Sequence, residues 1–178
     1  DEILDHESIE FMNPLIKKVD SKAQFEMWYN AKLQDSLTSQ YIKNQHDFHL
    51  EIIRKLNNSG VNIIAGTDAG IGVTIPGFSM HQELAFYKEA GLSNFEVLKT
   101  ATINAAQTHT IMNNMGSIEK GKIANLLILD KNPLVELSTL QNPATIFIQG
   151  RKLDKEKLIS FEQKAKGRKN FVASALRY

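Results

Sequence analysis

The sequence predicts an α/β protein in which helices alternate with a short buried strand and a small β-layer follows. A helix-periodic segment precedes a β-branched run that lies between two glycines, and further helical segments come after that run. From about residue 116 the pattern changes to short apolar runs separated by Asn-Pro turns. Because alternation of helix and strand favours a parallel sheet or barrel, we expect part of such a layer with a differently built β-end.

Composition sets bounds on this fold. The 178 residues are 42% hydrophobic and 23% charged, which is ordinary for a globular protein. A complete eight-stranded α/β barrel needs roughly 250 residues, so the chain is too short for one. Cysteine is absent, which excludes a disulfide framework, a cysteine-ligated zinc site and a cysteine nucleophile. No apolar stretch approaches the ~18 residues of a membrane span.

The first elements follow from periodicity and stop signals. A long helix is predicted from Thr38 or Ser39 to about Asn57, where Asn-Asn-Ser-Gly ends it. The run over residues 61–66 is β-branched and bounded by glycine on both sides, which predicts a buried strand. A glycine-rich loop follows, over residues 67–79.

Two helical segments come next. The first is predicted from near Met80 to Glu89, with Gly91 as its stop. Ser93 and Glu96 then fit a capping box, and the helical pattern continues to about residue 112.

The β-end and the tail complete the chain. A turn is predicted over residues 116–122, and short strands over residues 126–129 and 145–148. Residues 151–178 hold nine Lys or Arg and three acidic residues, so the tail carries a net charge of +6. We interpret it as a solvated basic helix, with contact to nucleic acid or an acidic surface as the alternative.

The densest chemical signal is the loop over residues 66–72, which contains Asp68 at the end of the predicted strand. Ligands of α/β folds bind at this end of the strands, because the connecting loops open there. Three interpretations stay open for Asp68. In the first, the Asp-x-Gly-x-Gly spacing belongs to a methyl-donor or nucleotide loop, which it fits weakly. In the second, Asp68 is a structural turn residue bonded to nearby amides. In the third, it is a strand-end carboxylate that binds zinc and accepts a proton.

Several motifs in order favour the last interpretation. They are GVxIxAGTDAG from Gly60, IPGFSMHxEL from Ile75, EAGLSxxEVLxxATxNAA from Glu89 and GSIExGKxANLxxLxxNPL from Gly116. This series resembles the imidazolonepropionase-like branch of the amidohydrolase superfamily, from about residue 60 to residue 153. The resemblance implies a metal-dependent (β/α)8 barrel beside a small β-sandwich, with Asp68 as the aspartate of the eighth strand, which binds metal and shuttles the proton of the hydrolytic water.

The family's other ligands have no counterpart here. They are a His-x-His on the first strand, a carboxylated Lys or a Glu on the fourth, and a His on each of the fifth and sixth, and no His-x-His occurs in this sequence. We therefore expect the C-terminal part of a longer enzyme, since the chain also starts on an acidic segment without Met. The expected domains are 1–115 (barrel), 116–153 (β-sandwich share) and 154–178 (basic helix or tail).

Further candidate residues surround this loop. The resemblance places His81 at the mouth of the pocket, and its alternative is a helix-start histidine satisfied by Glu83 or backbone. Thr67, Gly70 and Phe78 are expected to contact substrate. The apolar loop side chains either line that pocket or pack against missing barrel parts or a partner subunit; they are Ile71, Val73, Ile75, Phe78 and Met80.

The remaining histidines are weaker candidates for a functional site. His46 and His49 are spaced to share one helix face, but no third ligand is evident, so a solvated or interface face is the preferred interpretation over metal binding. His6 and His109 stand alone and are expected to be structural or surface residues.

The predicted function is hydrolysis of an amide, lactam, ester or dipeptide bond by the full-length parent, with one or two divalent metals, Zn²⁺ first. Asp68 is the predicted catalytic and metal-binding residue. This chain alone is expected to be inactive, because one carboxylate is fewer than the roughly three protein ligands of a catalytic zinc. Expected partners are a small-molecule substrate and either a second copy or the missing N-terminal part, with no nucleic acid and no membrane. A non-catalytic interaction domain of the same architecture is the alternative.

Overall fold

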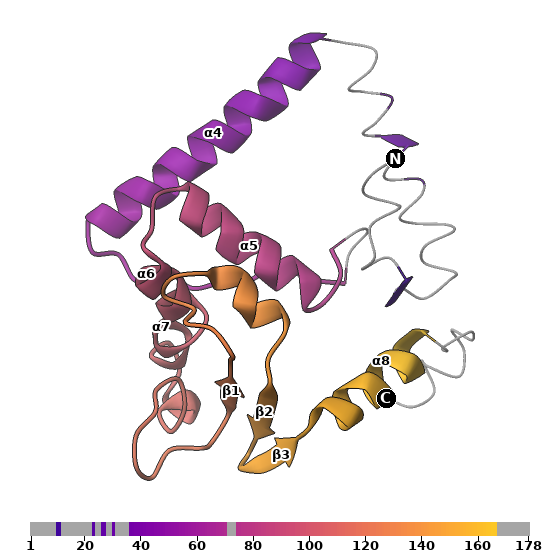
Figure 1. Cartoon of the computed structure of the whole chain (residues 1–178). Coiled ribbons are helices and arrows are strands. Elements are labelled where there is room, and N and C mark those ends of the chain that lie inside the picture. Colours follow the sequence, from indigo (N-terminus) through magenta and orange to yellow (C-terminus); the bar gives the residue numbers. More distant parts are fainter. Residues whose placement is uncertain are drawn as a thin grey trace. The chain divides into compact units, whose positions relative to one another are not determined.

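The computed structural model describes residues 10–11, 23, 26–27, 30, 36–70 and 74–166 (Figure 1). These residues belong to two compact units, each described by itself. The first unit comprises residues 1–46, 68–79 and 158–178, and the second comprises residues 47–67 and 80–157.

The described residues form a mixture of helices and one small sheet. The helices are α4 (Ser36–Asn58), α5 (Phe78–Glu89), α6 (Asn94–Thr100), α7 (Ile103–Ala106) and α8 (Lys155–Lys166), with short 3₁₀ turns η3 (Thr110–Met112) and η4 (Leu137–Gln141). The strands are β1 (Leu126–Ile128), β2 (Thr145–Ile148) and β3 (Arg151–Leu153). None of the described helices is long and apolar enough to cross a membrane.

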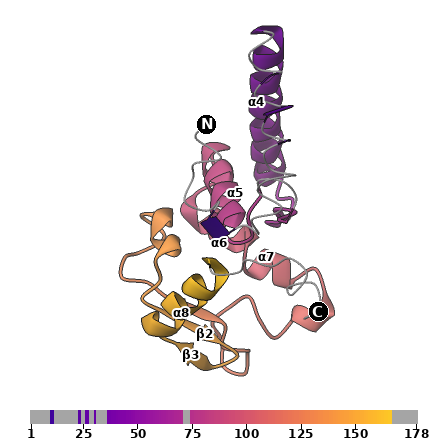
Figure 2. The same cartoon turned by 90° about the vertical axis from the view of Figure 1, so that its right-hand side faces the viewer.

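The predicted long helix that ends near Asn57 is confirmed. Figure 2 shows α4 as one unbroken helix, and it ends where the sequence predicts. Gly60 has φ = 75°, a left-handed conformation, and its N–H donates to the carbonyl of Asn57 at 3.0 Å. The N–H of Val61 then donates to the carbonyl of Leu56 at 3.1 Å. Glycine takes this conformation without steric cost, so the helix stops here and the chain turns away.

The capping box is also confirmed, but the helix that it starts is shorter than predicted. Ser93 caps α6, and Glu96 reaches back to the Ser93 backbone. The pattern predicts one helix to about residue 112, whereas α6 ends at Thr100 and α7 begins at Ile103. The hydroxyl of Thr102 donates to the carbonyl of Leu98 at 2.6 Å. Side-chain hydroxyls that bond backbone carbonyls in this way compete with helical hydrogen bonds, which explains the break.

The predicted strand over residues 61–66 is wrong for the described structure. These residues are extended but form no ladder, and Val61 and Ile64 are 48% and 40% exposed. A strand requires a neighbouring strand to bond, and none of the described segments supplies one beside it. Side chains and helix ends take over that bonding instead, as the site geometry below shows.

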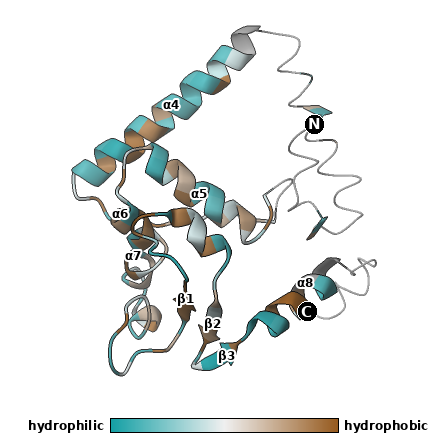
Figure 3. Ribbon diagram, in the orientation of Figure 1, coloured by the Kyte–Doolittle hydropathy of each residue, from teal (hydrophilic) through white to brown (hydrophobic). Residues whose placement is uncertain are grey.

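The sheet lies in the predicted β-end and is antiparallel, in the order β1-β2-β3. Strands β1 and β2 confirm the prediction, whereas β3 was not predicted. Leu127 pairs with Ile146, which pairs with Leu153. Successive strand residues point to opposite faces, and Figure 3 shows hydrophobic colour on β1 and β2. A sheet with apolar residues on both faces is typical of a layer that is covered on both sides.

The core of the second unit gathers around α5 and α6. Its buried members are Leu84, Tyr87, Ala90, Leu92 and Val97. Partly buried side chains from the segment before Asp68 and from η4 pack against it, so this core joins those elements to α5; they include Ile63, Ala65, Leu137 and Leu140. In the first unit Ile75 is buried, at 7% exposure.

Candidate functional site

Asp68 lies directly before a turn of the first unit and is exposed. Its φ is 48°, in the left-handed region that aspartate tolerates better than most residues. The N–H of Gly70 donates to the carbonyl of Thr74 at 2.8 Å, and Gly70 itself has φ = 113°, which favours glycine. This backbone therefore presents the Asp68 carboxylate at the surface.

The segment that leads to this turn is contacted at each of residues 63–66 by groups of the second unit. Asn104 Nδ2 donates to the carbonyl of Ile63 at 2.9 Å, and the N–H of Ala65 donates to the carbonyl of Thr100 at 3.1 Å. These two bonds tie the segment to the region of α6 and α7. They satisfy polar backbone groups that a neighbouring strand would otherwise bond.

Two side chains of α5 hold the same segment from another side. Glu83 Oε1 accepts the N–H of Gly66 at 2.8 Å and the hydroxyl of Tyr87 at 2.5 Å. The Tyr87 oxygen also lies 3.2 Å from the carbonyl oxygen of Ile64. Burial raises the pKa of Tyr87, and the hydrogen bond and charge of Glu83 raise it further. Tyr87 therefore stays protonated and remains a hydrogen-bond donor across the physiological pH range.

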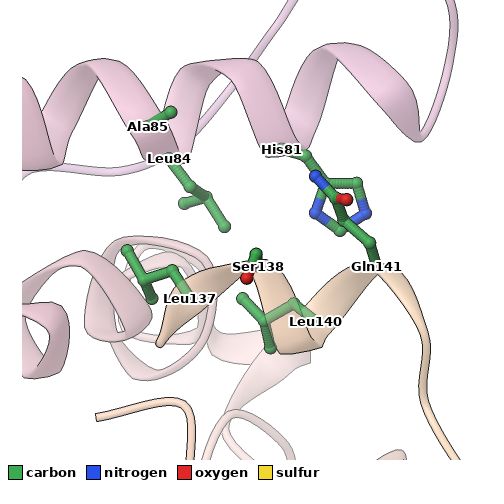
Figure 4. Close-up of a pocket in the computed structure, with 7 residues that line it drawn as sticks. All are labelled: His81, Leu84, Ala85, Leu137, Ser138, Leu140 and Gln141. Carbon is green, nitrogen blue, oxygen red and sulfur yellow. The ribbon is translucent and has the colours of Figure 1, made fainter. Parts of the chain in front are cut away.

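His81 lines a small cavity between α5 and η4, within the second unit (Figure 4). The cavity has a volume of about 130 Å³, and its walls combine apolar side chains with one imidazole, one amide and one hydroxyl. The lining residues are His81, Leu84, Ala85, Leu137, Ser138, Leu140 and Gln141. Burial lowers the pKa of His81, which favours the neutral imidazole, a form with one donor and one acceptor.

The other expected substrate contacts are distributed over both units. Thr67 is half-buried at the end of the held segment in the second unit, and Gly70 is exposed in the first unit. The ring of Phe78 lies against that of Phe11, with 5.2 Å between centroids and a tilt of 41°. Ser79 donates its hydroxyl to the carbonyl of Ile75 at 2.9 Å. Ile71 and Val73 lie outside the described residues, as does His6.

The described residues do not complete a metal site. Within them, no three His, Asp or Glu side chains are grouped closely enough to hold an ion. His46 and His49 lie on α4 without a third ligand grouped around them in the described ranges. A carboxylate oxygen is a ligand type that zinc accepts, so Asp68 suits a single position of a larger ligand set.

The contacts of Glu83 were not predicted from the sequence. The alternative considered for Glu83 is a bond to His81, whereas its carboxylate bonds Gly66 and Tyr87. The spacing of Glu83 and Tyr87 was a readable signal, because residues four apart share a helix face. Asn104 gave no local signal, since its partner Ile63 is 41 residues away.

Comparison with known proteins connects this geometry to a family. Residues 43–153 match the profile of the Amidohydrolase family. That range contains the held segment, Asp68, α5 and the whole of the small sheet.

Individual relatives match shorter stretches. The chain is 31% identical over 102 residues to ochratoxinase from Aspergillus niger, covering 56% of this chain and 20% of that protein. It is 32% identical over 100 residues to N-substituted formamide deformylase from Arthrobacter pascens, covering 52% and 18%. It is 37% identical over 78 residues to imidazolonepropionase from Thermoanaerobacter pseudethanolicus, covering 43% and 19%. The chain thus spans about a fifth of the length of these relatives.

Solved structures give the same relationship. A Xaa-Pro dipeptidase with bound methionine in its active site superposes with a TM-score of 0.52 at 30% identity, over 59% of this chain and 25% of that one. Phenylurea hydrolase B superposes with a TM-score of 0.50 at 25% identity, over 61% and 27%.

Proposed function

The chain belongs to the amidohydrolase family, and from that premise we propose that it is the C-terminal part of a metal-dependent hydrolase of carbon–nitrogen bonds. The substrate bond is an amide, a lactam or a dipeptide bond; an ester, which is a carbon–oxygen bond, is the alternative substrate outside that class. Named relatives and structural neighbours support this class, since they include a formamide deformylase, an imidazolonepropionase and a Xaa-Pro dipeptidase. Family membership also favours the interpretation of Asp68 as a metal ligand and proton acceptor over that of a methyl-donor loop.

The observation that carries the proposal is the placement of Asp68. It follows closely on a segment whose backbone is hydrogen-bonded at residues 63, 65 and 66, with the Tyr87 hydroxyl also near the carbonyl of Ile64, and its own side chain is exposed just before the next turn. A catalytic carboxylate needs both features, because its support must be fixed while its oxygens stay open to a reactant. A purely structural turn aspartate needs only the first.

In this role Asp68 does two things. It supplies one carboxylate to a centre whose other ligands come from the rest of the enzyme, outside the described residues. Its free oxygen accepts the proton of the attacking water and returns it to the leaving nitrogen, as a general base and then a general acid. A divalent metal such as zinc, when bound, lowers the pKa of a water molecule to about 7 and polarises the carbonyl.

The chain by itself is then inactive, since one carboxylate holds no catalytic metal. Its partner is the N-terminal remainder of the enzyme or a second copy of the chain, and its ligand is a small molecule. The apolar faces of the β-sheet support a packing partner, because Leu127, Ile128 and Ile148 are about half exposed in the second unit.

The test is turnover of the intact hydrolase on a panel that the relatives suggest, namely an N-substituted formamide, a Xaa-Pro dipeptide and a phenylurea. D68N should reduce kcat by about 10²–10⁴-fold, which is the usual contribution of a general base. Asp130→Asn, a change of the same chemistry at another exposed aspartate, should leave kcat unchanged.

Two results would contradict the proposal. Full turnover by D68N would remove Asp68 from the mechanism. An intact protein that binds no divalent metal and hydrolyses none of the panel would favour the non-catalytic interaction domain.

A further inference from the structure

The segment before Asp68 is fixed by hydrogen bonds more than by packing at its C-terminal end. Gly66 is exposed, and a Cβ built on it meets no atom within 4 Å. The space beside this residue is therefore open on the side where a side chain would project. The bond from its N–H to Glu83 Oε1, at 2.8 Å, is the polar contact that holds it.

Glu83 is itself held in place. It lies four residues before Tyr87 on α5, so the two side chains share a helix face. The ring of Tyr87 is buried in the core at 8% exposure, and its hydroxyl donates to the same Oε1 atom that Gly66 bonds. The buried ring of Tyr87 thus fixes the position of its hydroxyl. The hydroxyl orients the carboxylate of Glu83, and this carboxylate holds the backbone of Gly66.

The bonds involved are of the stronger kind. Both donors meet an acidic side chain, and hydrogen bonds to an ionised acceptor are roughly twice as strong as neutral ones. The Tyr87 oxygen is also within 3.2 Å of the Ile64 carbonyl, so the same pair of side chains touches the segment at two points. Gly66 lies only two residues before Asp68 in the chain.

We propose that Glu83 and Tyr87 are positioning residues for Asp68. They act through the backbone of residues 64–66, which determines the position of the catalytic carboxylate. This inference rests on the proposed function of Asp68. It deepens that proposal, because it assigns the control of the Asp68 position to two side chains of α5.

The first test measures amide hydrogen exchange at Gly66 in this chain. E83A removes the acceptor and should speed exchange at Gly66 about tenfold or more. E83Q should restore most of the protection, because both bonds converge on Oε1 and a glutamine carbonyl oxygen accepts both, as weaker neutral bonds. Gln82→Ala changes an exposed neighbour on the same helix and should leave exchange at Gly66 unchanged. Equal exchange in E83A and wild type would overturn the inference.

The second test measures divalent metal affinity of the intact hydrolase, with Mn²⁺ as the probe. Removing a group that orients a metal ligand typically weakens affinity 10–100-fold. E83A should show a loss of roughly this size and E83Q should recover most of it. Y87F keeps the buried ring but loses the hydroxyl, so it should give a partial loss. Y87F separates the hydrogen bond from core packing, since circular dichroism should show the same fold as wild type.

The outcomes distinguish a failure of the positioning role of Glu83 from a failure of the proposed function of Asp68. If E83A exposes the Gly66 amide but leaves Mn²⁺ affinity unchanged, Glu83 is a structural clamp and the positioning role is overturned. If the wild-type hydrolase itself binds no Mn²⁺, the proposed function of Asp68 fails first, whatever the exchange data show.

Discussion

The capping box of α6 makes part of the acid stability of the second unit depend on the carboxylate of Glu96. Its oxygens accept hydrogen bonds from the Ser93 backbone at 2.7 Å, the Ser93 hydroxyl at 2.6 Å and Asn57 Nδ2 at 2.9 Å. These hydrogen bonds lower the pKa of Glu96 from its ordinary 4.5 to about 2. The bond from the Ser93 side chain contributes most, followed by those from Asn57 and the Ser93 backbone.

The lowered pKa of Glu96 sets the size of its contribution to the free energy of unfolding. Each pKa unit corresponds to about 1.36 kcal/mol, so the shift sets a ceiling of about 3 kcal/mol. The carboxylate is partly open to water, which screens its interactions, and we therefore expect about 1 kcal/mol from its charge. Substituting Ser93 by Ala also removes the cap, which costs about 0.5–2 kcal/mol in comparable helices.

The lowered pKa of Glu96 also determines the direction in which its contribution to stability changes with pH. The unfolded chain takes up the proton at higher pH than the folded chain does, so the charge of Glu96 stabilises the fold above about pH 4.5. That stabilisation is lost as the pH falls from about 4.5 to about 2.

The assay is urea unfolding at a series of pH values for wild type and E96Q. Glutamine retains an acceptor, so it isolates the charge. E96Q should be about 1 kcal/mol less stable at pH 7, and the difference should shrink to a small fraction of that value as the pH falls to about 2. Glu156→Gln, in the first turn of α8, serves as the control. A difference between E96Q and wild type that is the same at pH 7 and pH 2 would refute this reasoning.

Further outcomes follow from burial, backbone conformation and ligand count. L92A should lower the free energy of unfolding by about 2–5 kcal/mol in a denaturant titration, because Leu92 is 1% exposed. Gly116→Ala should lower the melting temperature, because its Cβ would lie 2.6 Å from Ala106 Cβ at a φ of 86°; overpacking of this kind costs about 1–3 kcal/mol, and an unchanged melting temperature would contradict the contact. Calorimetric titration of this chain with Zn²⁺ should show no tight stoichiometric site, since Asp68 is one ligand of the roughly three needed, and tight binding at a ratio of one would show that the chain completes a site by itself.

Local signals predicted the helices well. The stop at Gly60 and the capping box at Ser93 depend on residues within a few positions of each other, so the sequence contains the whole cause. The predicted strand over residues 61–66 was wrong because strand pairing is a property of neighbours far away in the chain. Strand β3 was not predicted because it reads Arg-Lys-Leu, with charged residues where an apolar run is expected, and its pairing with β2 defines it instead.

The candidate site divides in the same way. Asp68 was identified from its glycine-rich surroundings and the series of family motifs, which are sequence-local. The supports of the segment before it come from α5 and from Asn104, at sequence separations of 17 to 41 residues. Helix periodicity shows that Glu83 and Tyr87 share a face, but the backbone that they meet is determined only by the folded chain.

Hydrolysis by the intact enzyme with Asp68 replaced by Asn tests most directly what this chain contributes. A folded D68N protein, verified by circular dichroism, should lose about 10²–10⁴-fold in kcat on whichever panel substrate the wild type cleaves, while Asp130→Asn retains full activity. Undiminished kcat in folded D68N would show that the carboxylate takes no part in the reaction.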